Sequence, residues 1–255
     1  MGLPLLDEEF ALKALVELIK IDADWVPHGD GTSLYIRPFI IGDDEHLGVH
    51  GVSHARYIVI LSPSGSYYAA GINPVKIMIE DEDVRAVRGG TGEAKCGGNY
   101  GASTRAGERA AEKGYSQVLW LDGVERKYIE EVGAMNIMFK IDGKICTPAL
   151  TGSILPGITR KSILEYLRSR GIEAEERLIS VDELIDAAEN GKLDEAWGCG
   201  TAAVVSPVGW LSYKDKTYEI CGGKIGETTQ MLYDEITGIQ WGRIADPFGW
   251  VYIVE

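Results

Sequence analysis

A single lysine lies between two pairs of glycines in the segment 89–100, whose sequence is GGTGEAKCGGNY. Glycine lets the backbone adopt positive φ values and approach a ligand closely. The run 102–113 that follows is typical of a helix, and a helix start offers free N–H groups to an anion. A lysine held in a folded interior shifts toward its neutral, nucleophilic form. Lys95 therefore has the surroundings expected of a lysine that forms a Schiff base.

Two common motifs of glycine-rich segments do not fit this one. A phosphate-binding P-loop has Gly immediately before its Lys and Ser or Thr immediately after it, but Ala94 and Cys96 occupy these positions. A dinucleotide-binding fingerprint that begins at Gly90 requires glycine at the position of Lys95. An ordinary loop whose lysine points into water remains open, and local composition alone favours it.

Candidate partners of this lysine follow in three places. Glu131 stands at the entrance of an apolar strand, where it could keep a proton on a ring nitrogen, although local sequence alone favours a surface acid. The segment 155–161 (LPGITRK) places amides and a threonine at a helix start, which suits a phosphate, and an ordinary Pro-Gly helix entry is equally compatible. The segment 198–202 (GCGTA) is a small-residue turn that offers N–H groups and a hydroxyl.

Three histidines recur every four residues at His46, His50 and His54. Glycines and β-branched residues between them argue against a continuous helix. Without a helix this spacing does not bring the imidazoles together, so we predict no metal site.

The composition excludes several classes of protein. With 255 residues, 45% of them hydrophobic and 25% charged, the chain is typical of a globular protein with one large or two ordinary domains. The net charge of −14 argues against binding to nucleic acid or to an anionic membrane. No apolar run is long enough for a transmembrane helix, and the first residues resemble neither a signal peptide nor a myristoylation motif.

The four cysteines are widely spaced, and none forms a C-x-x-C pair: Cys96, Cys146, Cys199 and Cys221. We predict that they are reduced and buried, which favours a cytoplasmic protein.

Hydrophobic periodicity predicts short helices and strands in irregular alternation, which favours an α+β fold. Helices are expected at 7–21, 102–113, 157–170, 181–190 and 227–237. Strands are expected at 33–38, 57–62, 75–80, 84–88, 117–121, 134–141 and 202–205, with hairpin turns at 142–143 and 214–216. The run 57–62 is predicted to be a buried strand, and Tyr35 and Arg37 share one side of theirs. The small residues of 67–74 are predicted to link two domains.

Taken together and in this order, the motifs resemble those of the branched-chain amino acid aminotransferases of the pyridoxal-phosphate fold type IV class. The resemblance covers essentially the whole chain. It rests on the segments 89–100, 131–136, 155–160 and 198–202, and further on 24–27 (DWVP), 31–38 (GTSLYIRP), 117–121 (QVLWL) and 239–242 (IQWG). It implies a two-domain fold in which 1–66 is the remainder of a small α+β domain and 75–255 is the large cofactor-binding domain.

The resemblance also implies how pyridoxal 5'-phosphate is held. Lys95 would form the Schiff base with it and later shuttle a proton, and Tyr100 would donate to the phenolic oxygen of the ring. Glu131 would keep the pyridine nitrogen protonated, so that the ring acts as an electron sink. The phosphate would be held by the amides of Ile158 and Thr159 together with Thr201.

On the substrate side, the resemblance implies a pocket lined by Tyr35, Arg37, Val49 and Tyr67. Tyr35 and Val49 would reach into the site of a partner subunit, which implies a homodimer. The substrate carboxylate would bind to the amides of Thr201 and Ala202. The reaction would transfer the amino group of leucine, isoleucine or valine to 2-oxoglutarate.

Two departures from the family pattern carry expectations of their own. Ala134 stands where the family usually has threonine, so a hydroxyl is missing there. Family members also carry a segment before the equivalent of Met1, including an arginine that binds the cofactor phosphate. We therefore expect this chain, taken as N-terminally truncated, to bind cofactor weakly and to have little or no turnover.

Two alternatives remain open. The chain could be another fold type IV enzyme, either a D-amino acid aminotransferase or an aminodeoxychorismate lyase, because these share the lysine and the glutamate. It could also be a catalytically silent relative that acts only as an assembly partner.

Overall fold

The computed structural model describes residues 1–65 and 72–255. Most of the predicted linker 67–74, including Tyr67, lies outside the described residues. Contacts within the chain define two compact units, Met1–Gly71 with Phe248–Glu255, and Ile72–Pro247. The two units are described separately.

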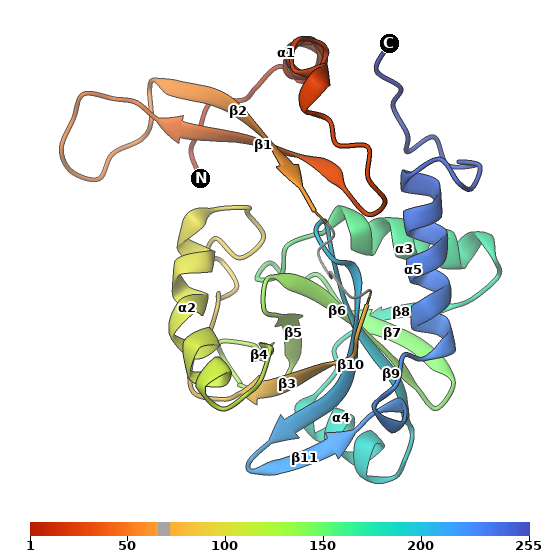
Figure 1. The fold of residues 1–255 in the computed structure, drawn as a ribbon. Helices are drawn as coiled ribbons and strands as arrows, with labels where there is room; N and C mark the ends of the chain where they lie inside the picture. Colours follow the sequence, from red (N-terminus) through yellow and green to blue (C-terminus); the bar gives the residue numbers. More distant parts are fainter. Residues whose placement is uncertain (66–71) are drawn as a thin grey trace. The chain divides into compact units, whose positions relative to one another are not determined.

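The first unit is built from a helix and a hairpin (Figure 1). Helix α1 (Glu8–Ile21) begins where the Asp7 carboxylate accepts a hydrogen bond from the amide of Phe10 at 2.7 Å. A short 3-10 helix (Ala23–Trp25) leads to strands β1 (Ser33–Gly42) and β2 (Ala55–Ser64), which pair antiparallel. The predicted helix and strands are therefore confirmed.

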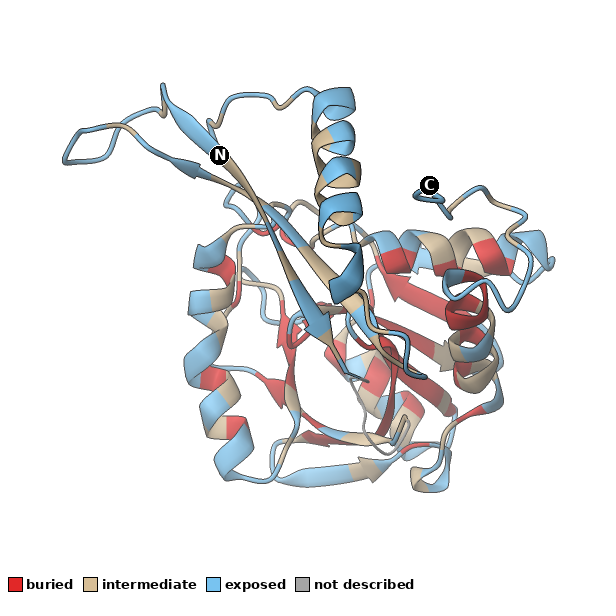
Figure 2. Ribbon diagram, turned by 45° about the horizontal axis from the view of Figure 1, so that its top comes forward, coloured by how far each residue is buried: buried red, intermediate tan, exposed pale blue. Residues whose placement is uncertain are grey.

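No described residue of this first unit is buried, as the absence of red from its ribbon in Figure 2 shows. The prediction of a buried strand at 57–62 is wrong, because every residue of β2 is exposed or half-buried. A run of β-branched residues predicts the strand correctly but does not reveal whether another layer covers it.

The second unit contains one mixed sheet. Its described strands are β3 (Val75–Glu80), β4 (Gln117–Leu121), β5 (Ile129–Val132), β6 (Met135–Ile141), β7 (Lys144–Pro148), β8 (Ala174–Arg177), β9 (Leu193–Gly200), β10 (Val204–Tyr213) and β11 (Lys216–Glu219). Strands β10, β3, β4, β5 and β6 are neighbours in that order. Because β9 pairs with both β6 and β10, these strands close into a barrel (Figure 1).

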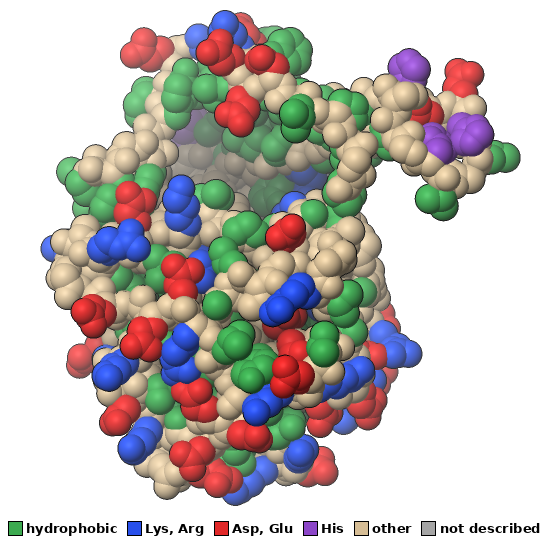
Figure 3. All heavy atoms as spheres, turned by 180° about the vertical axis from the view of Figure 1, so that it is seen from behind, with side chains coloured by type: hydrophobic (Ala, Val, Ile, Leu, Met, Phe, Trp, Pro, Cys, Tyr) green, Lys and Arg blue, Asp and Glu red, His purple; other side chains and the backbone are tan. Residues whose placement is uncertain are grey.

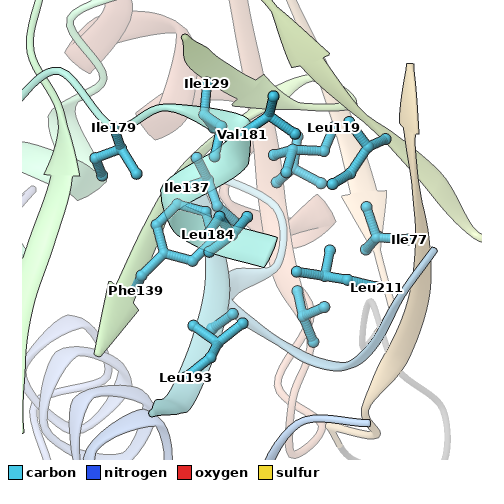
Figure 4. Close-up of a cluster of buried hydrophobic side chains, with 14 of the residues drawn as sticks. Ile77, Leu119, Ile129, Ile137, Phe139, Ile179, Val181, Leu184, Leu193 and Leu211 are labelled. Carbon is cyan, nitrogen blue, oxygen red and sulfur yellow. The ribbon is translucent and has the colours of Figure 1, made fainter. Parts of the chain in front are cut away.

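Helices α2 (Gly97–Glu112), α3 (Ile158–Ser169), α4 (Val181–Glu189) and α5 (Glu227–Gln240) surround these strands, and a 3-10 turn (Cys221–Gly223) precedes α5. The main core is formed by side chains that alternate inward along the strands and by one face of α4 (Figure 4). Ile77, Leu119, Ile137, Phe139 and Leu184 lie in this core. The mixture of parallel and antiparallel strand pairs with separate helices confirms the α+β prediction.

Three local predictions are corrected by the structure. The strand expected at 84–88 is absent from this described segment, which forms bends and turns with Arg85 buried. Helix α2 begins at Gly97 instead of Ala102. The strand expected to begin at Ala202 begins at Val204, because residues 201–203 form a turn.

The cysteines and histidines also differ in part from expectation. All four cysteines are free, but Cys221 is exposed and Cys96 is half-buried, so only Cys146 and Cys199 are buried as predicted. His46 and His50 lie with ring centroids 4.5 Å apart, so their imidazoles do meet in the loop between β1 and β2. Figure 3 shows histidine side chains (purple) gathered on the β1–β2 hairpin. Within 1–65 and 72–255, no helix is long and apolar enough to cross a membrane.

Candidate active site

One cavity of about 290 Å³ in the second unit is lined by all four of the segments that the sequence singled out. These segments are the glycine-rich loop before α2, the β5–β6 hairpin, the turn before α3 and the turn between β9 and β10. The lining residues are Lys95, Glu131, Ala134, Met135, Asn136, Leu155, Pro156, Gly157, Ile158, Thr159, Cys199, Gly200 and Thr201.

Lys95 lies two residues before the start of α2. Its amine donates a hydrogen bond to the hydroxyl of Tyr100, and Nζ is 4.7 Å from the centroid of that ring. Asn99 fixes the loop by donating to the carbonyls of Thr91 and Ala94, at 2.7 and 2.8 Å. The side chain of Lys95 is exposed and not held in the interior as expected, so it stands at the edge of the cavity.

Glu131 is 3% exposed and belongs to β5, opposite Asn136 of β6. Its Oε2 forms an ion pair with Arg85, and its Oε1 accepts from the side chain of Asn136 at 3.1 Å and from the amide of Leu155 at 3.2 Å. Burial raises the pKa of Glu131 to about 7, although Arg85 and the Leu155 amide act in the opposite direction. The prediction that Glu131 is a surface acid, which the local sequence favours, is therefore wrong.

The phosphate-type site expected at 155–161 is a helix N-terminus in the structure. Gly157 is the N-cap of α3 and has no side chain that could cap the helix, so the amides of Ile158 and Thr159 face this end. A Cβ at Gly157 would lie 2.1 Å from the side-chain oxygen of Asn136, so only glycine fits here. Thr201 lies in the turn after β9 and lines the same cavity.

The substrate-side residues of the resemblance belong to both units. In the first unit, Arg37 donates to the hydroxyl of Tyr35 at 2.7 Å, so the two side chains share one side of β1 as predicted. Val49 is fully exposed in the loop between β1 and β2. Ala202 is exposed beside Thr201 but does not line the cavity. Tyr67 lies outside the described residues.

The sequence pattern does not single out two polar residues near the cavity. It predicts Arg85 as part of a strand and Asn136 as one residue of an apolar strand. Both residues contact Glu131 and both are buried. The Arg85 side chain is 6% exposed and Asn136 is 5% exposed. An arginine between Val84 and Ala86 was the available signal, because a charged residue in an apolar context needs a partner.

The donor set at this cavity fits the pyridoxal phosphate that the sequence resemblance implies. It combines the amine of Lys95 beside the phenol of Tyr100, the buried carboxyl group of Glu131 and the start of α3, which has no side-chain cap. These groups suit an aldehyde, a ring nitrogen and a phosphate respectively.

Known proteins resemble this chain over nearly its whole length. The model of the family described as "Amino-transferase class IV" matches residues 3–209. Branched-chain-amino-acid aminotransferase 2 of Bacillus subtilis (strain 168) is 57% identical over 248 residues, which cover 97% of this chain and 68% of that protein. A probable branched-chain-amino-acid aminotransferase of Staphylococcus aureus (strain N315) is 54% identical over 256 residues, with 100% and 71% covered.

Solved structures agree with these relatives. The branched-chain amino acid aminotransferase from Escherichia coli superposes with a TM-score of 0.79 at 28% identity, covering 99% of this chain and 77% of that one. A second branched-chain amino acid aminotransferase, solved with pyridoxamine 5'-phosphate, gives a TM-score of 0.82 at 26% identity, with 98% and 77% covered.

Proposed function

This chain belongs to the class IV aminotransferases, and on that premise we propose that it transaminates branched-chain L-amino acids with 2-oxoglutarate as the amino acceptor. It is a transferase of the fold type IV class, and pyridoxal phosphate is its cofactor. Leucine, isoleucine and valine are converted to their 2-oxo acids, and 2-oxoglutarate becomes L-glutamate. Identity of 57% to a branched-chain-amino-acid aminotransferase supports the substrate class.

The observation that carries this proposal is the meeting of Lys95, Glu131 and the start of α3 at one cavity. When bound, the cofactor supplies the electron sink that weakens the bond from Cα to hydrogen. Lys95 is the residue that anchors the cofactor and moves this proton, and the neighbouring Tyr100 hydroxyl orients its amine. Glu131, which is buried and paired with Arg85, holds a proton on the ring nitrogen through its carboxylate.

Phosphate binding in this proposal falls to the start of α3 and to the turn after β9. The amides of Ile158 and Thr159 and the hydroxyl of Thr201 provide donors without a positively charged side chain among them. Amides of Thr201 and Ala202 would take the substrate carboxylate, and Tyr35, Arg37, Val49 and Tyr67 would line the pocket for its aliphatic side chain. The Arg37–Tyr35 hydrogen bond supports a shared role for these two residues.

We further propose a homodimer in the cytoplasm, with 1–66 as part of a small domain, 67–74 as a linker and 75–255 as the cofactor domain. Leu47 and Val49 are exposed at 95% and 108% on the β1–β2 loop, and the described part of the first unit has no buried residue. Apolar side chains displayed in this way favour a protein partner. The four free thiols suit a reducing compartment.

A spectroscopic and kinetic experiment tests the proposed function. The purified protein mixed with pyridoxal phosphate is expected to develop a visible band that borohydride bleaches, and Lys95→Ala is expected to lack it. Formation of the 2-oxo acid from L-leucine should exceed that from D-alanine by at least about 100-fold in kcat/KM. A preference for D-alanine would favour a D-amino acid aminotransferase, and the absence of the band in the unsubstituted protein would favour a silent assembly partner.

A further inference from the structure

Arg85 is the one cation paired with Glu131 in the described part of the chain, and both side chains are buried. Only 6% of the Arg85 side chain and 4% of the Glu131 side chain are exposed. Arg85 lies in the turns that follow β3, far from Glu131 in the sequence. A buried charge needs a partner, so the Glu131 carboxylate is stabilised by the guanidinium that lies beside it.

The same guanidinium also joins two backbone segments that border the cavity. It donates to the carbonyl of Ser153 at 3.0 Å and, at 3.5 Å, to the carbonyl of Gly92 in the loop that carries Lys95. These two segments touch, since a Cβ on Gly92 would lie 2.2 Å from the Ser153 oxygen. Arg85 therefore connects the lysine loop, the segment before α3 and the acid of β5.

We propose that Arg85 is a positioning residue that favours the ionised form of Glu131 and directs it at the cofactor ring nitrogen, while it holds the Lys95 loop against the segment before α3. This inference rests on the proposed function. It assigns to Arg85 a role that acts through Glu131 and through the backbone, without contact to the substrate.

The charges around Glu131 explain why this acid needs an arginine. Burial disfavours the carboxylate, and the neighbouring Glu130 on the same strand disfavours it further. Cys199 of β9 lines the same cavity, but burial raises its pKa to about 12, so the thiol stays neutral. Lys95 also lines the cavity, where its amine donates to the hydroxyl of Tyr100 and not to Glu131. The amides of Leu155 and Asn136 donate to Glu131 without bringing a charge. Arg85 is thus the charged group that offsets part of the effect of burial on the pKa of Glu131, and a neutral Glu131 would be a poor acceptor for a ring N–H⁺.

The first test measures the protonation of Glu131 directly in the cofactor-free protein. In pH-difference infrared spectra, Arg85→Gln should raise the pH midpoint of the buried carboxyl band by at least one unit. Glu131→Gln in either background should remove this band, which identifies its source. Arg88→Gln, an exposed arginine of the same segment, is the control and should leave the midpoint unchanged. An unchanged midpoint in folded Arg85→Gln would overturn the proposal, whether or not the protein is an aminotransferase.

The second test separates positioning from simple structural support in the cofactor-loaded enzyme. Arg85→Gln should lower kcat about 100-fold and change KM for L-leucine less than threefold, and Arg85→Lys should restore at least a tenth of kcat. Equal kcat for Arg85→Gln and the unsubstituted enzyme would contradict the proposal. If Arg85→Gln does not fold, Arg85→Lys provides both measurements, with a smaller shift of the infrared midpoint expected. Failure of the unsubstituted protein to form the visible band would count against the proposed function and leave the infrared result intact.

Discussion

At the scale of single residues, Gly92 sets how closely the lysine loop approaches the segment before α3. Its missing side chain leaves space that the backbone of Ser153 fills. We expect Gly92→Ala to destabilise the fold by about 2–3 kcal/mol, because a backbone carbonyl has to move aside. It should also weaken pyridoxal phosphate binding, which absorbance titration would measure.

The control for this variant is Gly101→Ala in α2, where an added Cβ meets nothing within 4 Å. Alanine in a helix interior is favoured over glycine by about 1 kcal/mol, so this variant should be as stable as the unsubstituted protein or more stable. If urea denaturation gave the same free energy of unfolding for Gly92→Ala and Gly101→Ala, the close approach of Gly92 to Ser153 would not contribute to stability.

Glu131 gives the cofactor-free protein a characteristic dependence of stability on pH. Its pKa is raised from 4.5 to about 7, so the folded state binds the proton more tightly than the unfolded chain. The resulting stabilisation is complete below pH 4.5 and is lost as pH rises through 7, a loss of about 3 kcal/mol. The pKa of Glu130 is also raised by burial and contributes in the same direction.

The corresponding prediction concerns Glu131→Gln, which remains neutral at every pH. The fall in the free energy of unfolding between pH 4.5 and 7, measured by urea denaturation without cofactor, should be clearly shallower in this variant. An identical slope in both proteins would refute the assignment of this pH dependence to Glu131.

The sequence predicts the chemical residues better than their surroundings. Lys95 and Glu131 stand in motifs whose order along the chain is informative. Arg85 was missed because its partners come from β5 and from the segment before α3, and local pattern carries no information on such distant pairs. The burial of Glu131 is not predicted for the same reason, since its carboxylate contacts Arg85 and Leu155, which are distant from it in the sequence.

At the scale of elements, a carboxylate from the barrel caps a helix. Glu195 of β9 accepts from the amides of Thr228 and Thr229, at 3.1 and 2.8 Å, and from the Thr229 hydroxyl at 2.7 Å. Gly226 before them leaves room for this carboxylate, since a Cβ there would lie 2.2 Å from it. The start of α5 is thus fixed to the barrel by tertiary hydrogen bonds and not by a residue of its own.

Glu195→Ala should therefore destabilise the protein by about 2–3 kcal/mol, because buried donors at the start of α5 lose their acceptor. Glu227→Ala removes the same charge from the exposed first turn of α5 and should cost less than about 1 kcal/mol. Thermal denaturation measures the loss of stability in both variants. A larger loss of stability in Glu227→Ala than in Glu195→Ala would contradict the assignment of Glu195 as the cap of α5.

Periodicity predicted most elements of the fold, including α1, α3, α4 and the strand 117–121, because each has an apolar face of regular spacing. It did not predict that α2 starts at Gly97, since the Asn99 side chain stabilises that start through contacts with the preceding loop. Periodicity does not predict the closed barrel either, because closure depends on β9 pairing with both β10 and β6, and β6 is distant from β9 in the sequence.

At the scale of the whole molecule, the two units differ in their cores. The second unit contains buried clusters of apolar side chains, whereas no described residue of the first unit is buried. Few buried contacts imply low local stability. We expect amides of α1, β1 and β2 to exchange hydrogen at least about 100-fold faster than those of β4 and β6, as measured by mass spectrometry. Comparable protection in both units would indicate a cover for the first unit, such as a second copy of the chain.

The pairing of β3 with β10 has a consequence for how this protein is made. Val75 lies beside Val208 in parallel register, so the barrel cannot close until the chain has been synthesised past β10. At a synthesis rate of roughly 5–20 residues per second, strands β3 to β6 keep an unpaired edge for on the order of ten seconds while the ribosome adds the residues up to β10. Unpaired edges invite association with other chains, so translation in the cell should favour binding of a chaperone to this nascent segment.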